Sequence, residues 1–283
     1  MMRVIDPLRQ RRASAYGAGP TIDAALDLCR RLAGEGFACT IGYTATPGEP
    51  ARSVADAHLA AFDRLAGAGL DAQVSVKLST LAFDPALFVE LEAAAAQSGA
   101  GLHIDALGPE TVDATWRLIQ SARRVARIGT TLPGAWARSV DDAALAARLG
   151  LRVRVVKGQW RDVSDPAEGF RRVVARLRGH PARVAVATHD VALLAESLHH
   201  LIAAGTPCAA ELFLGMPLGG PAATARRLGV PIRVYVPYGR AAAPYGVADV
   251  RANPAVAWWL IQDLLLGKDK TWRSLRRSRV ARA

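Results

Sequence analysis

Five side chains that could take part in chemistry stand near the ends of short apolar runs: Lys77, Asp105, Arg154, Lys157 and Tyr235. The clearest run is 151–160, LRVRVVKGQW, which reads as a buried strand and yet carries two arginines and a Lys-Gly pair. Fixed positive charge at a strand end, beside a glycine that lets a ligand approach the backbone, is typical of a site for an anionic or electron-rich ligand. The sequence therefore predicts such a site at this strand end.

Short apolar runs recur along the chain and are separated by longer amphipathic stretches. They begin near residues 38, 72, 101, 127, 151, 183, 208 and 232. The intervening segments 53–69 and 84–99 have apolar residues at helical spacing, and the second opens with a Pro at the first helical position. This alternation predicts an α/β fold, a single (β/α)8 barrel of the TIM type, for which ~250 residues is typical. A doubly wound open sheet is the alternative.

Alternation within the runs separates an aliphatic face from a polar one. In 72–79, for example, Val74 and Val76 alternate with Ser75 and Lys77. If the aliphatic face packs against the outer helices, the polar face points into the barrel, where unpaired charge is costly. We therefore expect these groups to pair with one another, with water or with a ligand, in a site at the C-terminal mouth of the barrel. The charged ones are Lys77, Asp105, Arg154, Glu211 and Arg233.

Composition narrows the class of protein. With 283 residues and 51% hydrophobic content, the chain can bury a large core. We find no apolar run of ~18 residues and no secretory signal, and therefore expect a cytoplasmic protein. No composition shift divides the chain, which predicts one domain over 1–283 with an N-terminal extension of about 1–20.

A basic tail at 268–283 carries much of the net charge of +11. It is compatible with a solvated terminus or with docking at an anionic membrane surface. The tail lacks the interleaved aromatic residues that stack on bases, so we expect no nucleic-acid partner.

Two other chemistries use the same residues. A metal hydrolase would take its ligands from His103, Asp105, His189, Asp190 and Glu211. A Schiff-base enzyme would use the amine of Lys77 or Lys157. Neither explains why a guanidinium, an ammonium and a glycine gather within 154–158, and we predict no metal site. The sequence also has no G-x-G-x-x-G or P-loop motif for binding phosphates.

Six short motifs together resemble the proline dehydrogenase family. They are SVKLSTL (75–81), IDA (104–106), VRVVKG (153–158), ATHD (187–190), LGM (214–216) and RVYVPYG (233–239). Each is weak alone, but all six occur in order and at fitting intervals between about 38 and 245. The resemblance implies a distorted (β/α)8 barrel that holds FAD noncovalently. It also implies oxidation of proline to a cyclic imine at the carbon next to nitrogen, with a membrane quinone as electron acceptor.

The resemblance also implies roles for individual residues. Cofactor-binding positions would be Arg154, Val156, Lys157, Gly158, Trp160, Thr188 and His189. Catalytic and substrate-binding positions would be Lys77, Asp105, Tyr235, Tyr245 and Arg251. Arg154 would lie against the N5 edge of the flavin, where its charge would stabilise the anionic reduced ring. We expect the flavin and its substrate to complete the pairing of the inward charges.

The chain departs from the family pattern after Tyr245. Where the family has an Arg-Arg pair that grips the proline carboxylate, this sequence has Ala248 and Asp249, which leaves Arg251 as the expected substitute. The motif VKGQW is one residue shorter than the family's VKGAYW, and LPGAW replaces Gln-Ala-Tyr at the fourth strand. We therefore expect a proline dehydrogenase-like enzyme that acts on proline or a related cyclic amine. The basic tail would allow this cytoplasmic enzyme to be peripheral to the inner membrane. The alternative is an inactive barrel kept as a flavin-binding or regulatory subunit.

Overall fold

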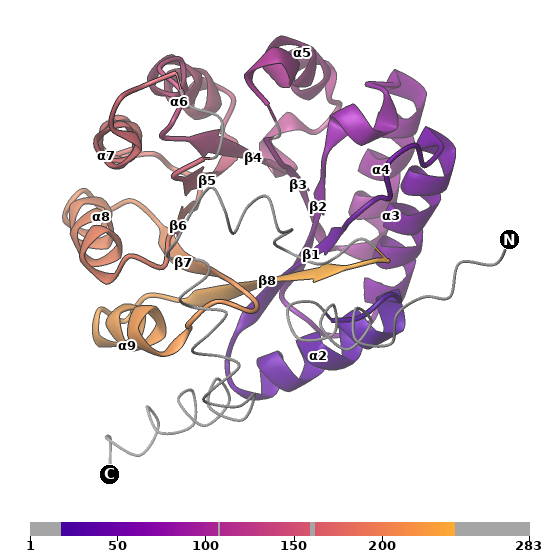
Figure 1. The fold of residues 1–283 in the computed structure, drawn as a ribbon, viewed down its shortest axis with the longest axis horizontal. Coiled ribbons are helices and arrows are strands. Elements are labelled where there is room, and N and C mark those ends of the chain that lie inside the picture. The colour runs from indigo at the N-terminus through magenta and orange to yellow at the C-terminus, as the bar shows by residue number, and fades with distance from the viewer. Residues whose placement is uncertain (1–17, 107, 159–161, 241–283) are drawn as a thin grey trace, which may run out of the picture.

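The computed structural model describes residues 18–106, 108–158 and 162–240. Its strands form one closed parallel barrel in the order β1 to β8, and β8 pairs with β1 to complete the circle (Figure 1). The strands are β1 (Ala38–Tyr43), β2 (Ala72–Val76), β3 (Gly101–Ile104), β4 (Ile128–Pro133), β5 (Arg152–Val156), β6 (Val184–Ala187), β7 (Cys208–Phe213) and β8 (Ile232–Tyr238).

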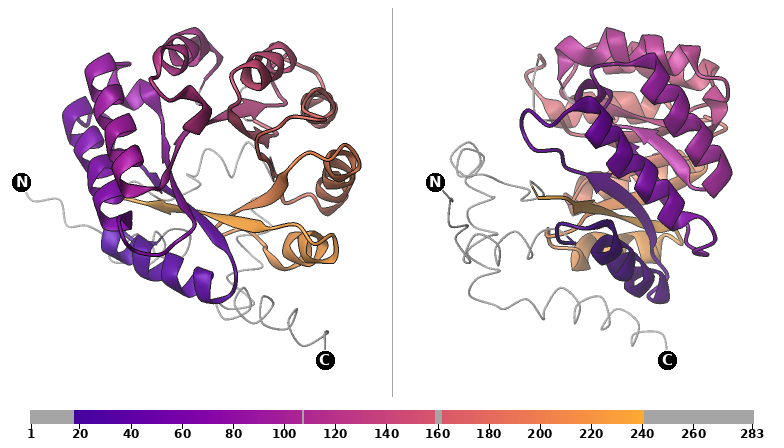
Figure 2. Two further views of the ribbon diagram at one scale, coloured as in Figure 1. Left: turned by 180° about the vertical axis from the view of Figure 1, so that it is seen from behind. Right: turned by 90° about the vertical axis from the view of Figure 1, so that its right-hand side faces the viewer.

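Helices surround the strands on the outside, as the views in Figure 2 also show. The α-helices are α2 (Ile22–Gly34), α3 (Ala51–Leu65), α4 (Pro85–Ser98), α5 (Val112–Ser121), α6 (Ser139–Arg148), α7 (Pro166–Arg176), α8 (Val191–Ala203) and α9 (Gly219–Arg227). Three 3-10 helices, η1 (Leu78–Leu81), η2 (Pro109–Thr111) and η3 (Val125–Arg127), lie in the connections. None of the helices in the described ranges is both long and apolar enough to cross a bilayer.

Local sequence signals explain where these elements begin. The side chain of Asp84 caps α4 by accepting hydrogen bonds from the amides of Ala86 and Leu87, and Pro85 occupies the first helical position. The helix ends at Gly99, which adopts φ 75°. In α3, Val54, Ala55, His58, Ala61, Phe62 and Leu65 are buried. They recur at helical spacing and so form the stripe that packs inward.

The predicted architecture is confirmed. All eight apolar runs form strands, and the pairing of β1 with β8 excludes the open sheet that was the alternative. The predicted helices at 53–69 and 84–99 correspond to α3 and α4. The predicted N-terminal extension lies almost wholly outside the described residues, as does the whole basic tail, so the single-domain boundary of 1–283 stays a prediction.

The two faces of each strand also separate as expected. Aliphatic residues such as Val74, Val155 and Leu212 are buried in the hydrophobic core that joins strands to helices. Polar residues from strands that are not neighbours, including Thr40 on β1 and Glu211 on β7, hydrogen-bond to one another. Such contacts are possible only across the inside of a closed barrel, so the polar face points inward.

Candidate active site

Arg154 on β5 is the centre of the polar network inside the barrel. Arg154 is 3% exposed, and its guanidinium forms two parallel hydrogen bonds with Glu211 on β7, from Nε to Oε2 at 2.9 Å and from Nη2 to Oε1 at 2.7 Å. Longer contacts run from Nη1 to Ser75 and Asp105, both at 3.4 Å, and from Nη2 to Thr40 at 3.5 Å. Burial disfavours the charged form, but Glu211 and Asp105 outweigh it and raise the pKa of Arg154, which stays protonated.

Asp105, directly after β3, is the second member of the network. Its carboxylate accepts hydrogen bonds from Thr131 at 2.9 Å and Ser75 at 3.3 Å, and its Oδ2 lies 3.7 Å from the Nζ of Lys77. Burial raises the pKa of Asp105, but Lys77, Arg154 and the two hydroxyls reverse this, so that the net shift is downward. The site therefore holds an ionised carboxylate facing a lysine at the ends of two neighbouring strands.

Tyr235 on β8 supplies the aromatic wall of the cluster. Its ring stacks on Phe213 with centroids 5.3 Å apart and an interplanar angle of 13°, and the Arg154 guanidinium lies 5.3 Å from the ring centroid. The ring reaches over β1 at Gly42, where a Cβ atom would come within 2.1 Å of the phenol oxygen. Tyr235 and then Asp105 raise the pKa of Lys77, against the effect of burial. Lys77 is therefore a cation at neutral pH.

A second group lies at the ends of β5 and β6. Lys157 is 43% exposed in its side chain and pairs with Asp190 at 3.2 Å. Gly158 adopts φ +88°, and a Cβ there would stand 2.7 Å from that of Pro133, so both the backbone angle and the space favour glycine. Thr188 is buried and accepts a hydrogen bond from the amide of Asp190.

His189 is fully engaged by the protein backbone. Its Nε2 accepts a hydrogen bond from the amide of Phe213 at 2.9 Å, which assigns the proton to Nδ1, 3.1 Å from the carbonyl oxygen of Pro217. Burial lowers the pKa of His189, so the ring is neutral. One ring nitrogen ties the loop after β6 to β7 and the other ties it to the segment that follows β7, so only the ring faces and edges remain for contact with a ligand.

The structure thus brings together four of the predicted substrate and cofactor residues, Lys77, Asp105, Arg154 and Tyr235, inside one barrel. Val156, the last residue of β5, accepts the Gly134 amide hydrogen bond through its carbonyl. Trp160, Tyr245 and Arg251 lie outside the described residues, so their predicted roles stay predictions.

Two expectations about the inward charges need correction. Protein carboxylates already pair Lys77 and Arg154, so a ligand is not needed to complete their pairing. Arg233 lies at the other end of the barrel, because it is the second residue of β8 and its guanidinium bonds Asp71 and the carbonyl of Cys39. The strand alternation predicted the inward direction of each side chain but could not predict its partner.

Glu211 is the functional candidate that the family motifs did not supply. The alternation within β7 placed it on the inward face, and that was the signal for it. Its place beside Arg154 follows only from the way β5 and β7 flank β6, which brings the two side chains together on the inner face of the barrel.

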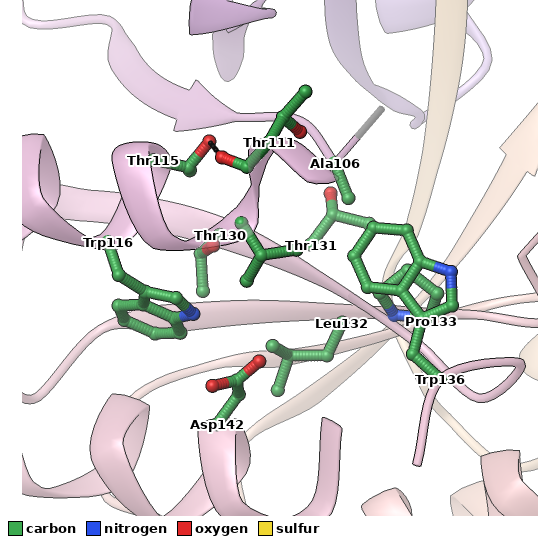
Figure 3. Close-up of a pocket in the computed structure, with 11 residues that line it drawn as sticks. Ala106, Thr111, Thr115, Trp116, Thr130, Thr131, Leu132, Pro133, Trp136 and Asp142 are labelled. Atoms are coloured by element: carbon green, nitrogen blue, oxygen red, sulfur yellow. Dashed lines mark hydrogen bonds between the residues drawn. The ribbon is translucent and has the colours of Figure 1, made fainter. Parts of the chain in front are cut away.

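A pocket borders this cluster on the outer side of β4 (Figure 3). It lies between β4, α5 and α6 and has about 320 Å³ of space, part of it open to solvent. Its walls include Trp136, Thr131 and Asp142, and the Asp142 carboxylate bonds Arg138 at 3.0 Å. Thr131 belongs to both the pocket and the cluster, because it lines the pocket and its hydroxyl donates to Asp105.

The residues present fit a flavin in chemical type. Lys157 is half-exposed, and its ion pair with Asp190 is the kind of surface pair that contributes little and can yield to an anionic ligand. Gly158 leaves backbone free of a side chain, and Tyr235 with Phe213 offers a flat aromatic surface. Arg154 would have to engage a ligand by giving up its longer contacts to Ser75 or Asp105.

Comparisons with known proteins agree with this reading. Proline dehydrogenase 1 of Bacillus subtilis subsp. natto and that of Bacillus subtilis strain 168 are each 25% identical over 276 residues, which cover 89% of this chain and 90% of the relative. No protein-family model matches the chain.

Solved structures show the same fold. Proline utilization A (PutA) from Bdellovibrio bacteriovorus has a TM-score of 0.73 at 15% identity over 82% of this chain, and PutA from Corynebacterium freiburgense has a TM-score of 0.64 at 14% identity over 98%. The matched parts span 31% and 35% of those longer proteins. The resemblance to the proline dehydrogenase family predicted from the motifs is confirmed.

Proposed function

We propose that this proline dehydrogenase-like barrel is a flavin-dependent oxidoreductase that oxidises proline or a related cyclic amine to an imine. The observation that supports the proposal most is the gathering of Lys77, Asp105, Arg154 and Tyr235 in one buried cluster, each at its place in a family motif. The two Bacillus relatives are named proline dehydrogenase, and this chain matches 90% of the length of each. FAD is the cofactor that the family resemblance implies.

The opposite charges of Lys77 and Asp105 suit an amino acid zwitterion. Their charged atoms lie 3.7 Å apart, so a substrate could place its carboxylate at Lys77 and its ammonium at Asp105. Tyr235 would pack against the ring of the substrate. When bound, a flavin supplies the acceptor for the hydride leaving the carbon next to nitrogen.

Lys77 offers one cation where the family uses an arginine pair, and Asp249 adds a negative charge in the sequence nearby. A single ammonium binds a carboxylate as a point charge, without the two parallel hydrogen bonds of a guanidinium. We therefore propose that the enzyme accepts amines whose carboxylate is esterified, amidated or absent at least as well as free proline.

The test is anaerobic reduction of the flavin-loaded protein. The purified protein should be yellow, or become so with added FAD, and the flavin absorbance should bleach with a cyclic amine. A panel of proline, proline ester, proline amide and a carboxylate-free cyclic amine then ranks the substrates. A colourless protein that takes up no FAD would contradict the proposal. A flavin-loaded protein that no amine bleaches would favour the inactive, flavin-binding alternative.

We further propose a membrane quinone as the electron acceptor, reached by docking of the basic tail 268–283 at an anionic lipid surface. The support is the resemblance and the charge of the tail.

A further inference from the structure

Glu211 is the strongest partner of Arg154, and it has no role in the substrate binding and hydride transfer proposed for this barrel. Glu211 is 3% exposed, and its carboxylate accepts both short hydrogen bonds of the guanidinium. Thr40 donates to the same carboxylate at 2.7 Å, and Gln73 donates to Thr40 at 2.9 Å. This chain of bonds fixes the orientation of the carboxylate toward Arg154.

The pairing changes what Arg154 offers to a neighbour. An isolated guanidinium acts on a nearby group as a full positive charge, whereas one held at 2.7 and 2.9 Å by a carboxylate acts largely as a dipole. The interior of the barrel is poorly screened, since both partners are almost fully buried. The positive field at the cofactor is therefore set by the pair and not by Arg154 alone.

We propose that Glu211 is a positioning residue that offsets the charge of Arg154 and thereby keeps the reduction potential of the bound flavin low. The inference rests on the proposed function, because it assumes that Arg154 faces a flavin. It predicts that the intact pair stabilises the negative charge of the reduced flavin only weakly. Once Glu211 is made neutral, Arg154 should stabilise that charge strongly.

The test is the flavin midpoint potential in four FAD-loaded proteins: wild type, Glu211→Gln, Arg154→Met and the double variant. Glu211→Gln should raise the potential by about 30 mV or more, a tenfold change in a two-electron equilibrium. Arg154→Met should lower it by a similar amount. The double variant should return to within about 10 mV of wild type, close to a twofold change. The double variant also replaces a buried ion pair by neutral groups, which proteins tolerate better than removal of one partner.

Sulfite affinity gives a second readout that does not depend on turnover. Sulfite binds flavins with gain of negative charge at the ring, so Glu211→Gln should lower its dissociation constant at least tenfold. Asp71→Asn is the matched control, because Asp71 is the carboxylate partner of the buried Arg233 at the opposite end of the barrel. It should leave the potential and the sulfite affinity unchanged.

A purely structural role for Glu211 would lower stability and leave the potential where it is. Equal potentials in wild type and Glu211→Gln would therefore overturn the inference. If Glu211→Gln does not fold, the double variant decides: a potential about 30 mV or more above that of Arg154→Met supports the inference, and an equal one overturns it. A wild-type protein that takes up no FAD overturns the proposed function and this inference together. Flavin-loaded variants that share one potential overturn the inference alone.

Discussion

Arg154 and Glu211 are 57 residues apart in the sequence and form the most buried ion pair among the described residues. Around them, hydroxyl groups of Thr40, Ser75 and Thr131 orient the charged groups. A typical barrel of this type fills its interior with layers of branched aliphatic side chains. Here polar side chains replace some of these aliphatic ones, and Thr40, Ser75 and Thr131 each hydrogen-bond to a charged group. At the scale of single residues, the interior is built to hold charge in place.

His58 is as buried as Arg154 and Glu211, but its side chain is uncharged in the folded protein. It is 1% exposed, its Nδ1 has no hydrogen-bond partner within the described residues, and its ring meets Tyr43 edge-on at 5.9 Å. Burial, with a smaller contribution from Lys77, lowers the pKa of His58 to about 3. A neutral imidazole is therefore part of the folded state at physiological pH.

The lowered pKa predicts a pH-dependent loss of stability. The unfolded chain takes up the His58 proton below about pH 6.5 and the folded chain only near pH 3, so stability falls as pH drops through this window. From pH 6.5 to 5, this group should account for about 2 kcal/mol of the lost unfolding free energy. Urea unfolding of His58→Phe, which keeps a ring against Tyr43, should show a shallower decline over that range. A variant as acid-sensitive as wild type would contradict the assignment.

Packing between elements depends on two glycines. The start of α7 lies so close to the segment after β4 that a Cβ on Gly169 would stand 1.9 Å from the carbonyl oxygen of Gly134. The atom in the way is backbone, which cannot rotate aside as a side chain would. This contact holds the start of α7 against the segment that follows β4, and Gly158 after β5 packs against Pro133 at the end of β4.

Gly169→Ala should therefore destabilise the protein by about 2 to 3 kcal/mol, because the helix must move away from the barrel. Gly34→Ala is the matched control, since Gly34 is also helical and a Cβ there meets no atom within 4 Å. That substitution should be neutral or stabilising by up to about 1 kcal/mol through its helix propensity. Thermal or urea unfolding of both variants measures the difference. A Gly169→Ala protein as stable as Gly34→Ala would show that the close approach is not required.

At the scale of the whole molecule, positive charge is unevenly distributed. Acidic and basic residues nearly balance over the described barrel, whereas the segments before residue 18 and after residue 240 are strongly basic. Net charge of this kind acts on solubility and on association with anionic surfaces, not on the fold. The barrel and the tail can therefore have separate roles.

Truncation after residue 267 tests the proposed docking. The full chain should bind vesicles that contain anionic phospholipid at low ionic strength and release them as salt rises, because exposed charges are screened over about 10 Å at 0.1 M. The truncated chain should bind at least tenfold more weakly, with its flavin content unchanged. Sedimentation with vesicles and with neutral-lipid controls measures this. Equal binding by the two chains would remove the tail from the proposal.

The sequence by itself determined the strands, the barrel and the inward direction of its polar side chains. These follow from local rules: strand alternation assigns Ser75 and Lys77 to one face and Val74 and Val76 to the other wherever the strand is placed. The motifs likewise predicted that Lys77, Asp105, Arg154 and Tyr235 lie together, and they do. Each motif is a short run of consecutive residues, so it can be recognised in the sequence without a structure.

Only the tertiary structure decided which charges meet. The pairing of Arg154 with Glu211, the full engagement of His189 by backbone and the place of Arg233 at the far end depend on the register of the closed barrel. Register aligns β5 and β7 through β6 and joins β8 to β1, and a slip of one residue would reverse every face. An ion pair between strands that are not hydrogen-bonded to each other is a property of that register, and no local pattern in the sequence encodes it.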